Sequence, residues 1–191
     1  LSAWHGPEGD LITHDEVPGK PGYTAEGDHA GNSGNVAVSS VYNTSARSHI
    51  ELWMTGPFHA IGILRPELQR VGFGKCDSTS TPKWHSGATL DVLSGLGTEQ
   101  PRSTAVVWPG NGSTTNLNKF VVETPDPRTF CGWGGESVGL PVIAMMPEDV
   151  NGGVSATITG PNGPLETCAI SELNTSGTAQ AILDWDDAIE G

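Results

Sequence analysis

The clearest hydrophobic pattern in the chain lies between residues 45 and 54. Bulky or apolar side chains recur there at helical spacing on one face, at Ala46, His49, Ile50, Trp53 and Met54. The polar residues Arg47, Ser48 and Glu51 fall on the other face. The periodicity therefore predicts an amphipathic helix over residues 45–54. Gly56-Pro57 predicts its end, because proline lacks an amide donor and disfavours helical angles in the residue before it.

Two short apolar pieces follow this helix. Leu64-Arg65-Pro66 predicts the close of an apolar turn, and residues 71–74 (VGFG) predict a small strand. His59 lies between the helix end and the turn, which makes it a candidate site residue. His49, on the apolar face of the helix, is predicted to be a packed histidine with one satisfied hydrogen bond.

The second half of the chain reads as short strands separated by turns. Residues 88–92 are predicted to add a strand to the N-terminal domain, and an apolar run covers residues 140–146. Pro161-Asn162-Gly163 predicts the turn of a hairpin formed by residues 153–159 and 165–170. A last strand is predicted over residues 179–185. This spacing is typical of a small Ig-like β-sandwich.

The N-terminal signals occur in an order that resembles the CAP superfamily of cysteine-rich secretory, antigen-five and pathogenesis-related proteins. Residues 53–66 (WMTGPFHAIGILRP) and 71–74 are similar to the bacterial pattern W-M-x-S-P-x-H-x-x-N-I-L-x-P followed by V-G-x-G. A second block, with His14, residues 22–27 (GYTAEG) and residues 33–37 (SGNVA), is similar to H-x(n)-Y-x-x-x-G followed by G-E-N-I-A. The resemblance covers residues 11–74.

The resemblance implies an α-β-α sandwich and a cleft in which two histidines and two glutamates hold a metal. The histidines correspond to His14 and His59, whereas both glutamate positions carry glycine, at Gly34 and Gly56. The family's asparagine is likewise replaced, by Gly62. Glu16, Asp15 or Glu51 are left as substitutes, and zinc is the metal that paired imidazoles suit, with Glu16 as third ligand. The alternative is a structural pair of hydrogen-bonded histidines.

The predicted fold class is α+β, in three segments. Residues 1–95 form the CAP-like domain, residues 96–128 a connector, and residues 129–191 the Ig-like β-sandwich. Gly and Pro interrupt the first helix after Leu1-Ser2-Ala3-Trp4, and the chain ends directly after the strand predicted at 179–185. We therefore expect an N-terminal helix that is truncated and a sandwich that lacks its last strand.

Charge and composition narrow the functional classes. The formal charge is -13 with only 9 Lys and Arg, which leaves no basic patch for nucleic acid or for an anionic membrane surface. No apolar run is long enough to predict a transmembrane segment. Only 16% of the residues are charged and 26 are glycine, a mixture that favours turns, short strands and an extracellular location.

The cysteines number three, at Cys76, Cys131 and Cys168. Cys131 and Cys168 bracket the strand-rich part, so a disulfide between them is predicted, with a stabilisation of about 3 to 4 kcal/mol for a loop of that size. Cys76 is then free or pairs outside this sequence.

Three functions are consistent with these signals. The first is a secreted or cell-surface, non-enzymatic binding or structural protein whose cleft around His14 and His59 holds a metal, a small molecule or a lipid. The second is a metal-dependent hydrolase of peptide or cell-wall material, in which water on His14 and His59 is activated with Glu16 as base. The third is an architectural subunit joined to neighbouring chains through an open β-edge at its C-terminal strand. The sequence contains no G-x-S-x-G elbow of the kind that carries a nucleophilic serine. A Ser-His-Asp set cannot be selected from the many serines without knowing the fold.

Overall fold

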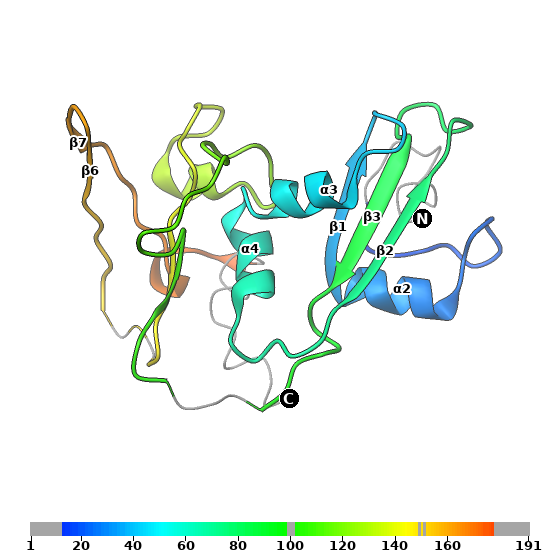
Figure 1. The fold of residues 1–191 in the computed structure, drawn as a ribbon, viewed down its shortest axis with the longest axis horizontal. Helices are drawn as coiled ribbons and strands as arrows, with labels where there is room; N and C mark the ends of the chain where they lie inside the picture. Colours follow the sequence, from blue (N-terminus) through cyan, green and yellow to red (C-terminus); the bar gives the residue numbers. More distant parts are fainter. Residues whose placement is uncertain (1–12, 99–101, 149, 151, 178–191) are drawn as a thin grey trace. The chain divides into compact units, whose positions relative to one another are not determined.

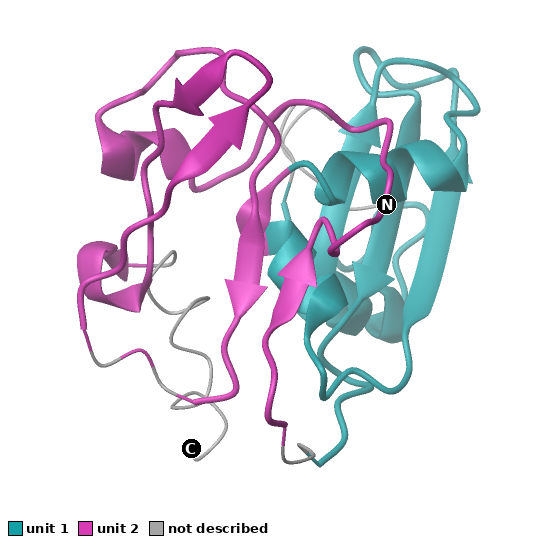
Figure 2. Ribbon diagram, turned by 60° about the vertical axis from the view of Figure 1, so that its left-hand side comes forward, with its two compact units in different colours: residues 1–55, 59–101 teal, residues 56–58, 102–191 magenta. Residues whose placement is uncertain are grey.

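A computed structural model describes residues 13–98, 102–148, 150 and 152–177 of the chain. It contains helices together with small antiparallel sheets, so the α+β class is confirmed. The chain forms two compact units, coloured in Figure 2. Unit 1 comprises Leu1–Thr55 and His59–Pro101, and unit 2 comprises Gly56–Phe58 and Arg102–Gly191.

Unit 1 is built around a three-stranded antiparallel sheet (Figure 1). Its strands are β1 (Gly34–Ser39), β2 (Gly72–Asp77) and β3 (Ser86–Asp91), and β3 lies in the centre. The small strand predicted at residues 71–74 is confirmed as β2, and the strand predicted at 88–92 is confirmed as β3. Strands β1 and β2 both run antiparallel to β3, and each pairs with one side of it.

Helices cover both faces of this sheet. Trp53 of α3 (Ala46–Trp53) is buried with Ala37, Ala88 and Leu90, whose side chains share one face. The other helix, α2 (Ala25–Asn32), contacts β1 and β3. Figures 1 and 2 show α2 and α3 on opposite sides of the sheet. Burial on both faces explains why Val36 and Ala37, neighbours in β1, are both removed from solvent.

The helix predicted over residues 45–54 is confirmed as α3. Its N-cap is Ser45, whose side-chain oxygen accepts from the Ser48 N–H, and the helix ends before Gly56-Pro57 as predicted. The expected apolar turn that follows is wrong. Residues 57–64 form a helix, α4 (Pro57–Leu64), with the proline at its first position. Proline there needs no amide donor and already has a helical φ, so it begins a helix as readily as it ends one.

Unit 2 consists of short antiparallel pairs. Strand β4 (Val106–Trp108) pairs with β5 (Ile143–Met145), and β6 (Ile158–Gly160) pairs with β7 (Gly163–Leu165) across the predicted turn. The hairpin is therefore confirmed, but its second strand begins at Gly163, inside the predicted turn, and residues 166–170 do not form a strand. Two 3-10 helices complete the unit, η2 (Pro127–Cys131) and η3 (Glu172–Asn174).

The expected Ig-like sandwich remains a prediction. A sandwich requires two packed sheets of several strands, and the described part of unit 2 contains two pairs of short strands. The strand predicted at residues 179–185 and the helix expected at Leu1-Ser2-Ala3-Trp4 lie outside the described residues. Most of the segment expected to be a connector, from Arg102 onward, belongs to unit 2 and contains β4. Among the helices of the described ranges, none has the length and apolar character needed to cross a bilayer.

Candidate functional site

His14 is exposed and is joined to helix α2 by backbone and side-chain contacts. Its ring Nδ1 lies 2.7 Å from the carbonyl oxygen of Gly31. A Cβ atom on Gly31 would lie only 2.4 Å from the His14 carbonyl oxygen, so glycine is needed for this close approach. Asn32 also donates to the His14 carbonyl, at 3.4 Å. These contacts hold the segment before α2 against the end of the helix.

Glu16 is buried, with 6% of its surface exposed, at the other end of the same helix. Its carboxylate accepts from the N–H of Thr24, the N-cap residue of α2, at 3.3 Å. The Glu16 N–H donates to Asp28 Oδ1 at 2.6 Å. A carboxylate is stabilised at a helix N-terminus by the free backbone amides and by the helix dipole. The chemistry of Glu16 in this position is therefore that of an anionic cap.

His59 is half-buried in α4, one residue beyond the part of that helix that belongs to unit 2. Its carbonyl oxygen accepts a hydrogen bond from Asn35 Nδ2 at 3.0 Å, which ties α4 to β1. In the ranges that the structure describes, no group of three or more His, Cys, Asp or Glu residues is placed to hold a metal ion. The expected zinc set of His14, Glu16 and His59 is therefore not assembled. Neither Asp15 nor Glu51 completes it.

The donor set consequently does not fit zinc, and the physical reason lies in α2. His14 and Glu16 contact opposite ends of this helix, through Gly31 and Thr24, although only one residue separates them in the sequence. Glu51 instead forms a surface ion pair with Arg47, at 2.7 Å. These contacts give the candidate ligands structural tasks that the sequence pattern does not reveal.

A buried polar cluster joins α3 to the sheet. The sequence predicted only one of its members, His49. His49 is 1% exposed and its Nε2 lies 3.1 Å from the hydroxyl of Ser86, which is fully buried. The predicted packed histidine with one hydrogen bond is confirmed. Asp77 is the cross-strand neighbour of Ser86, and it forms an ion pair with Lys75 on the same face of β2.

Electrostatics in this cluster favour the neutral imidazole. Burial lowers the pKa of His49 below its ordinary value of 6.5, the Lys75 ammonium lowers it further, and the Asp77 carboxylate opposes both effects. The Lys75 ammonium and then the Ser86 hydroxyl hold the pKa of Asp77 below its usual range. The cluster thus holds one ion pair beside an uncharged histidine.

The cluster contains a serine, a histidine and an aspartate, which are the residue types of a hydrolase triad. Its burial argues against that chemistry, because no substrate carbonyl reaches a hydroxyl with 0% exposure. In a triad, the aspartate orients the histidine, whereas here Asp77 lies beside the serine through the β2–β3 register. The arrangement fits a structural polar contact between helix and sheet.

Unit 2 contains a second buried acid that the sequence analysis missed. Glu123 is 5% exposed, and its Oε2 accepts from the backbone N–H of Phe58 at 3.2 Å. Phe58 is the second residue of α4, so this carboxylate caps that helix. A Cβ atom on Gly56 would lie 2.7 Å from Glu123 Oε1. The position where the CAP resemblance expects a glutamate therefore needs glycine, because another carboxylate occupies the space.

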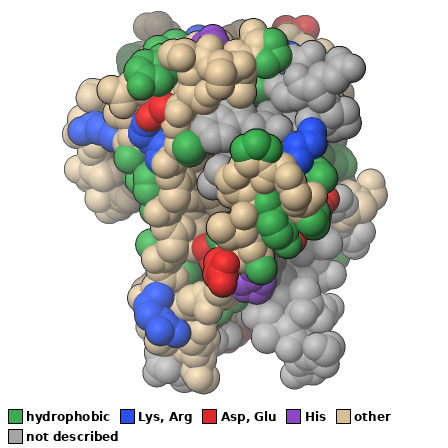
Figure 3. Space-filling view, turned by 90° about the vertical axis from the view of Figure 1, so that its right-hand side faces the viewer, with side chains coloured by type: hydrophobic (Ala, Val, Ile, Leu, Met, Phe, Trp, Pro, Cys, Tyr) green, Lys and Arg blue, Asp and Glu red, His purple; other side chains and the backbone are tan. Residues whose placement is uncertain are grey.

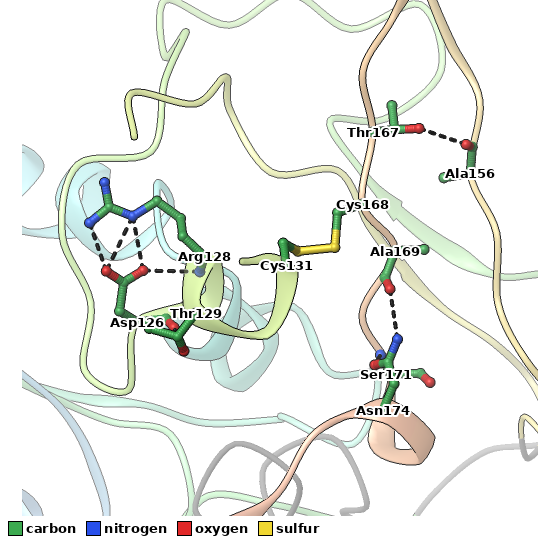
Figure 4. Close-up of a disulfide and its surroundings, with 10 residues drawn as sticks. All are labelled: Asp126, Arg128, Thr129, Cys131, Ala156, Thr167, Cys168, Ala169, Ser171 and Asn174. Atoms are coloured by element: carbon green, nitrogen blue, oxygen red, sulfur yellow. Dashed lines mark hydrogen bonds and ion pairs between the residues drawn. A yellow bond between two sulfur atoms is a disulfide. The ribbon is translucent and has the colours of Figure 1, made fainter. Parts of the chain in front are cut away.

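The predicted disulfide is present between Cys131 and Cys168 (Figure 4), with Cα atoms 5.9 Å apart. It links the end of η2 to the segment that leads into η3. Close to it, Asp126 caps η2 and forms an ion pair with Arg128, at 2.7 Å. Cys76 carries a free thiol on β2 and is half-buried.

The surface shows no gathering of cationic side chains on the face drawn in Figure 3, where Lys and Arg are dispersed. This distribution agrees with the low count of basic residues in the sequence. No protein-family model, curated protein or solved structure matches this chain.

Proposed function

We propose that this chain is a secreted or cell-surface protein with a non-enzymatic binding or structural role. The observation that carries the proposal is the structural use of its chemically versatile side chains. His14 and Glu16 fasten the segment before α2, His49 joins α3 to the sheet, and Glu123 caps α4. A catalytic group needs access to a substrate, and three of these four residues, Glu16, His49 and Glu123, are buried.

An oxidising location supports the extracellular part of the proposal. A structural disulfide such as Cys131–Cys168 persists in secreted and surface proteins and is rare in reducing compartments. The resemblance to the CAP superfamily, in its bacterial branch, points the same way. The α-β-α sandwich that it implies and the Ig-like sandwich that the strand spacing predicts belong to this proposal. The ligand that the resemblance favours is a small molecule or a lipid held near His14 and His59.

Zinc binding at His59 provides the decisive test, because the hydrolase alternative requires a metal. Wild type, His59→Ala and the control His29→Ala are equilibrated with zinc, dialysed, and analysed by elemental mass spectrometry. We expect the same low zinc content in all three proteins, since the described residues lack a three-ligand group. His29→Ala reports adventitious binding, because His29 is an exposed residue of α2.

About one zinc per chain in the wild type and in His29→Ala, lost in His59→Ala, would place a metal at His59 and contradict the structural use of the candidate ligands on which the proposal rests. Such a result transfers support to the metal-dependent hydrolase, and peptide and cell-wall substrates would then be assayed with the zinc-loaded protein.

A further inference from the structure

Strand β2 lies at the edge of the unit 1 sheet. The strand order β1-β3-β2 leaves its outer side without a strand partner among the described residues. The first half of β2 is exposed, and Phe73 keeps 41% of its surface accessible. An exposed strand edge offers a row of backbone donors and acceptors to a second strand.

The hydrogen bonds of the sheet show which β2 residues face this edge. Val92 donates its N–H to Ser33 in the direction of β1, at 3.1 Å. Because successive residues of a strand alternate in direction, the odd-numbered residues of β3 face β2. The bond from the Ser78 N–H to the His85 carbonyl, at 3.0 Å, agrees with this phase, whereas the His85 N–H, just before β3, donates to the Ser39 carbonyl of β1 at 2.8 Å. The backbone groups of Lys75 and Asp77 therefore point outward, and those of Cys76 point to β3.

The charges along this edge are self-complementary. Lys75 and Asp77 lie on the same face of β2, on either side of Cys76. If two copies of β2 pair antiparallel with Cys76 opposite Cys76, Lys75 of each copy lies opposite Asp77 of the other. A shift of the two strands by one residue pair places Lys75 opposite Lys75, or Asp77 opposite Asp77. Opposite charges stabilise cross-strand pairs and like charges destabilise them, so one register is favoured.

We propose that β2 is a self-pairing edge that joins two copies of this chain, with a disulfide between their Cys76 residues. Since Lys75 and Asp77 carry the outward backbone groups, they form the hydrogen-bonded pairs of the new ladder. Cys76 then occupies a non-hydrogen-bonded pair, where opposing Cα atoms lie about 4.5 Å apart. That separation lies within the range that a disulfide spans.

The oxidant is a small-molecule disulfide of the glutathione type. The Cys76 thiolate of one copy attacks this disulfide, which forms a mixed disulfide and releases one small thiol. The thiolate of the second copy then attacks the protein sulfur and releases the second thiol. Each protein thiol gives up one proton and one electron, and the small disulfide is reduced to two thiols.

The paired stretch between two β2 strands is short, which explains why a disulfide is needed to hold the two copies together. With Cys76 opposite Cys76, only residues 75–77 of each β2 strand lie opposite strand residues of the other copy, so few ladder bonds form and association gains from a covalent link at the centre. The edge also differs from the C-terminal one expected from the sequence, which lies outside the described residues. The inference is independent of the proposed binding role, and neither depends on the other.

The test follows covalent dimer formation by the full chain. Purified protein is incubated with oxidised glutathione and analysed by non-reducing electrophoresis and by mass spectrometry. We expect a species of twice the 19.9 kDa chain mass, linked through Cys76 and reversed by reductant. Cys76→Ser is expected to remain monomeric. Failure of the wild type to form more dimer than Cys76→Ser overturns the proposal.

Two sets of variants test the register. Asp77→Lys places lysines opposite each other and is expected to slow dimer formation about fivefold. The double variant Lys75→Asp, Asp77→Lys restores opposite charges and is expected to recover the wild-type rate. Far-UV circular dichroism checks that each variant folds. Equal rates in all three proteins, or a swap that fails to rescue a folded chain, would refute the register.

A relocated thiol separates strand pairing from random collision. Gly74 has open space at its missing Cβ, so Cys76→Ser combined with Gly74→Cys retains the fold. In the proposed register the two relocated thiols are four residues apart along the strands, about 13 Å. This variant is expected to form little dimer. Dimer formation as fast as in the wild type contradicts the specific edge.

Discussion

At the residue scale, the environment of His49 shows how a titratable group can serve packing alone. The imidazole is neutral in the folded chain because burial and the Lys75 charge disfavour its cation. Its ring lies beside that of Trp53, with centroids 6.4 Å apart, so any loosening of α3 changes the surroundings of that indole.

The first prediction concerns acid. The folded pKa of His49 lies below the ordinary value near 6.5, so the unfolded chain binds the proton first as the pH falls. Stability is unaffected by this group above about pH 6.5 and declines below it. We expect the urea midpoint, followed by far-UV circular dichroism, to fall between pH 7.5 and pH 5. In His49→Gln this fall is smaller, and at pH 7.5 the variant is less stable by about 1 to 2 kcal/mol.

Two controls accompany this titration. His29→Gln changes an exposed histidine and should titrate like the wild type. Lys75→Gln removes a cation that lowers the folded pKa of His49, so this pKa moves closer to its unfolded value and the stability lost in acid should be smaller. If His49→Gln and the wild type lose the same stability in acid, the cluster does not control the response.

At the element scale, the sequence predicted the parts with strong periodicity and missed those built by distant contacts. Helix α3 has a clear apolar face, and the β6–β7 turn contains Asn and Gly, so both were predictable. Helix α2 contains two glycines and lacks such a face. Its formation depends on the Thr24 cap and on packing of residues far from it in sequence.

The same limit applies to the candidate site. The CAP resemblance pointed to His14 and Glu16, and local signals pointed to His49 and the disulfide. Their partners come from other elements, and this decides that Glu16 caps a helix instead of completing a metal site. Glu123 lies between a valine and a threonine in a stretch with no motif, so no local signal predicted its burial.

The second prediction concerns the cap of α4. Glu123→Ala removes the acceptor of the buried Phe58 N–H and should destabilise unit 2 by about 1 to 3 kcal/mol. Glu123→Gln retains an acceptor oxygen and should recover part of this loss. Thermal unfolding measured by circular dichroism provides the comparison. Glu166→Ala, at an exposed position of unit 2, should lie within about 0.5 kcal/mol of wild type; an equal loss there would argue against the cap.

At the scale of the whole molecule, the two units differ in how they are stabilised. Unit 1 has a buried apolar cluster between its helices and sheet. The described part of unit 2 consists of short strand pairs and 3-10 helices around a disulfide. Small strand-poor regions of this kind bury little apolar surface and depend more on cross-links.

The third prediction follows from this difference. The disulfide joins residues 37 apart in sequence, and its loss should cost about 4 kcal/mol by loop entropy. In the double variant Cys131→Ser, Cys168→Ser, amide exchange should become faster in β4 and β5 and change little in β1 and β3. Hydrogen exchange with mass spectrometry resolves these segments. Equal acceleration in both units would show that the disulfide supports the entire chain.

Unit 2 takes three residues, Gly56–Phe58, from the middle of the chain that otherwise builds unit 1. No single cut near residue 101 therefore yields two whole pieces. A fragment starting at Arg102 retains Glu123 and Phe130 but loses the Phe58 amide and ring that contact them. In gene shuffling or domain grafting, the two units therefore cannot be exchanged as two continuous segments of the chain. An engineer who wants unit 2 alone must supply the tripeptide of residues 56–58, for example by fusing it to the fragment that starts at Arg102 through a linker.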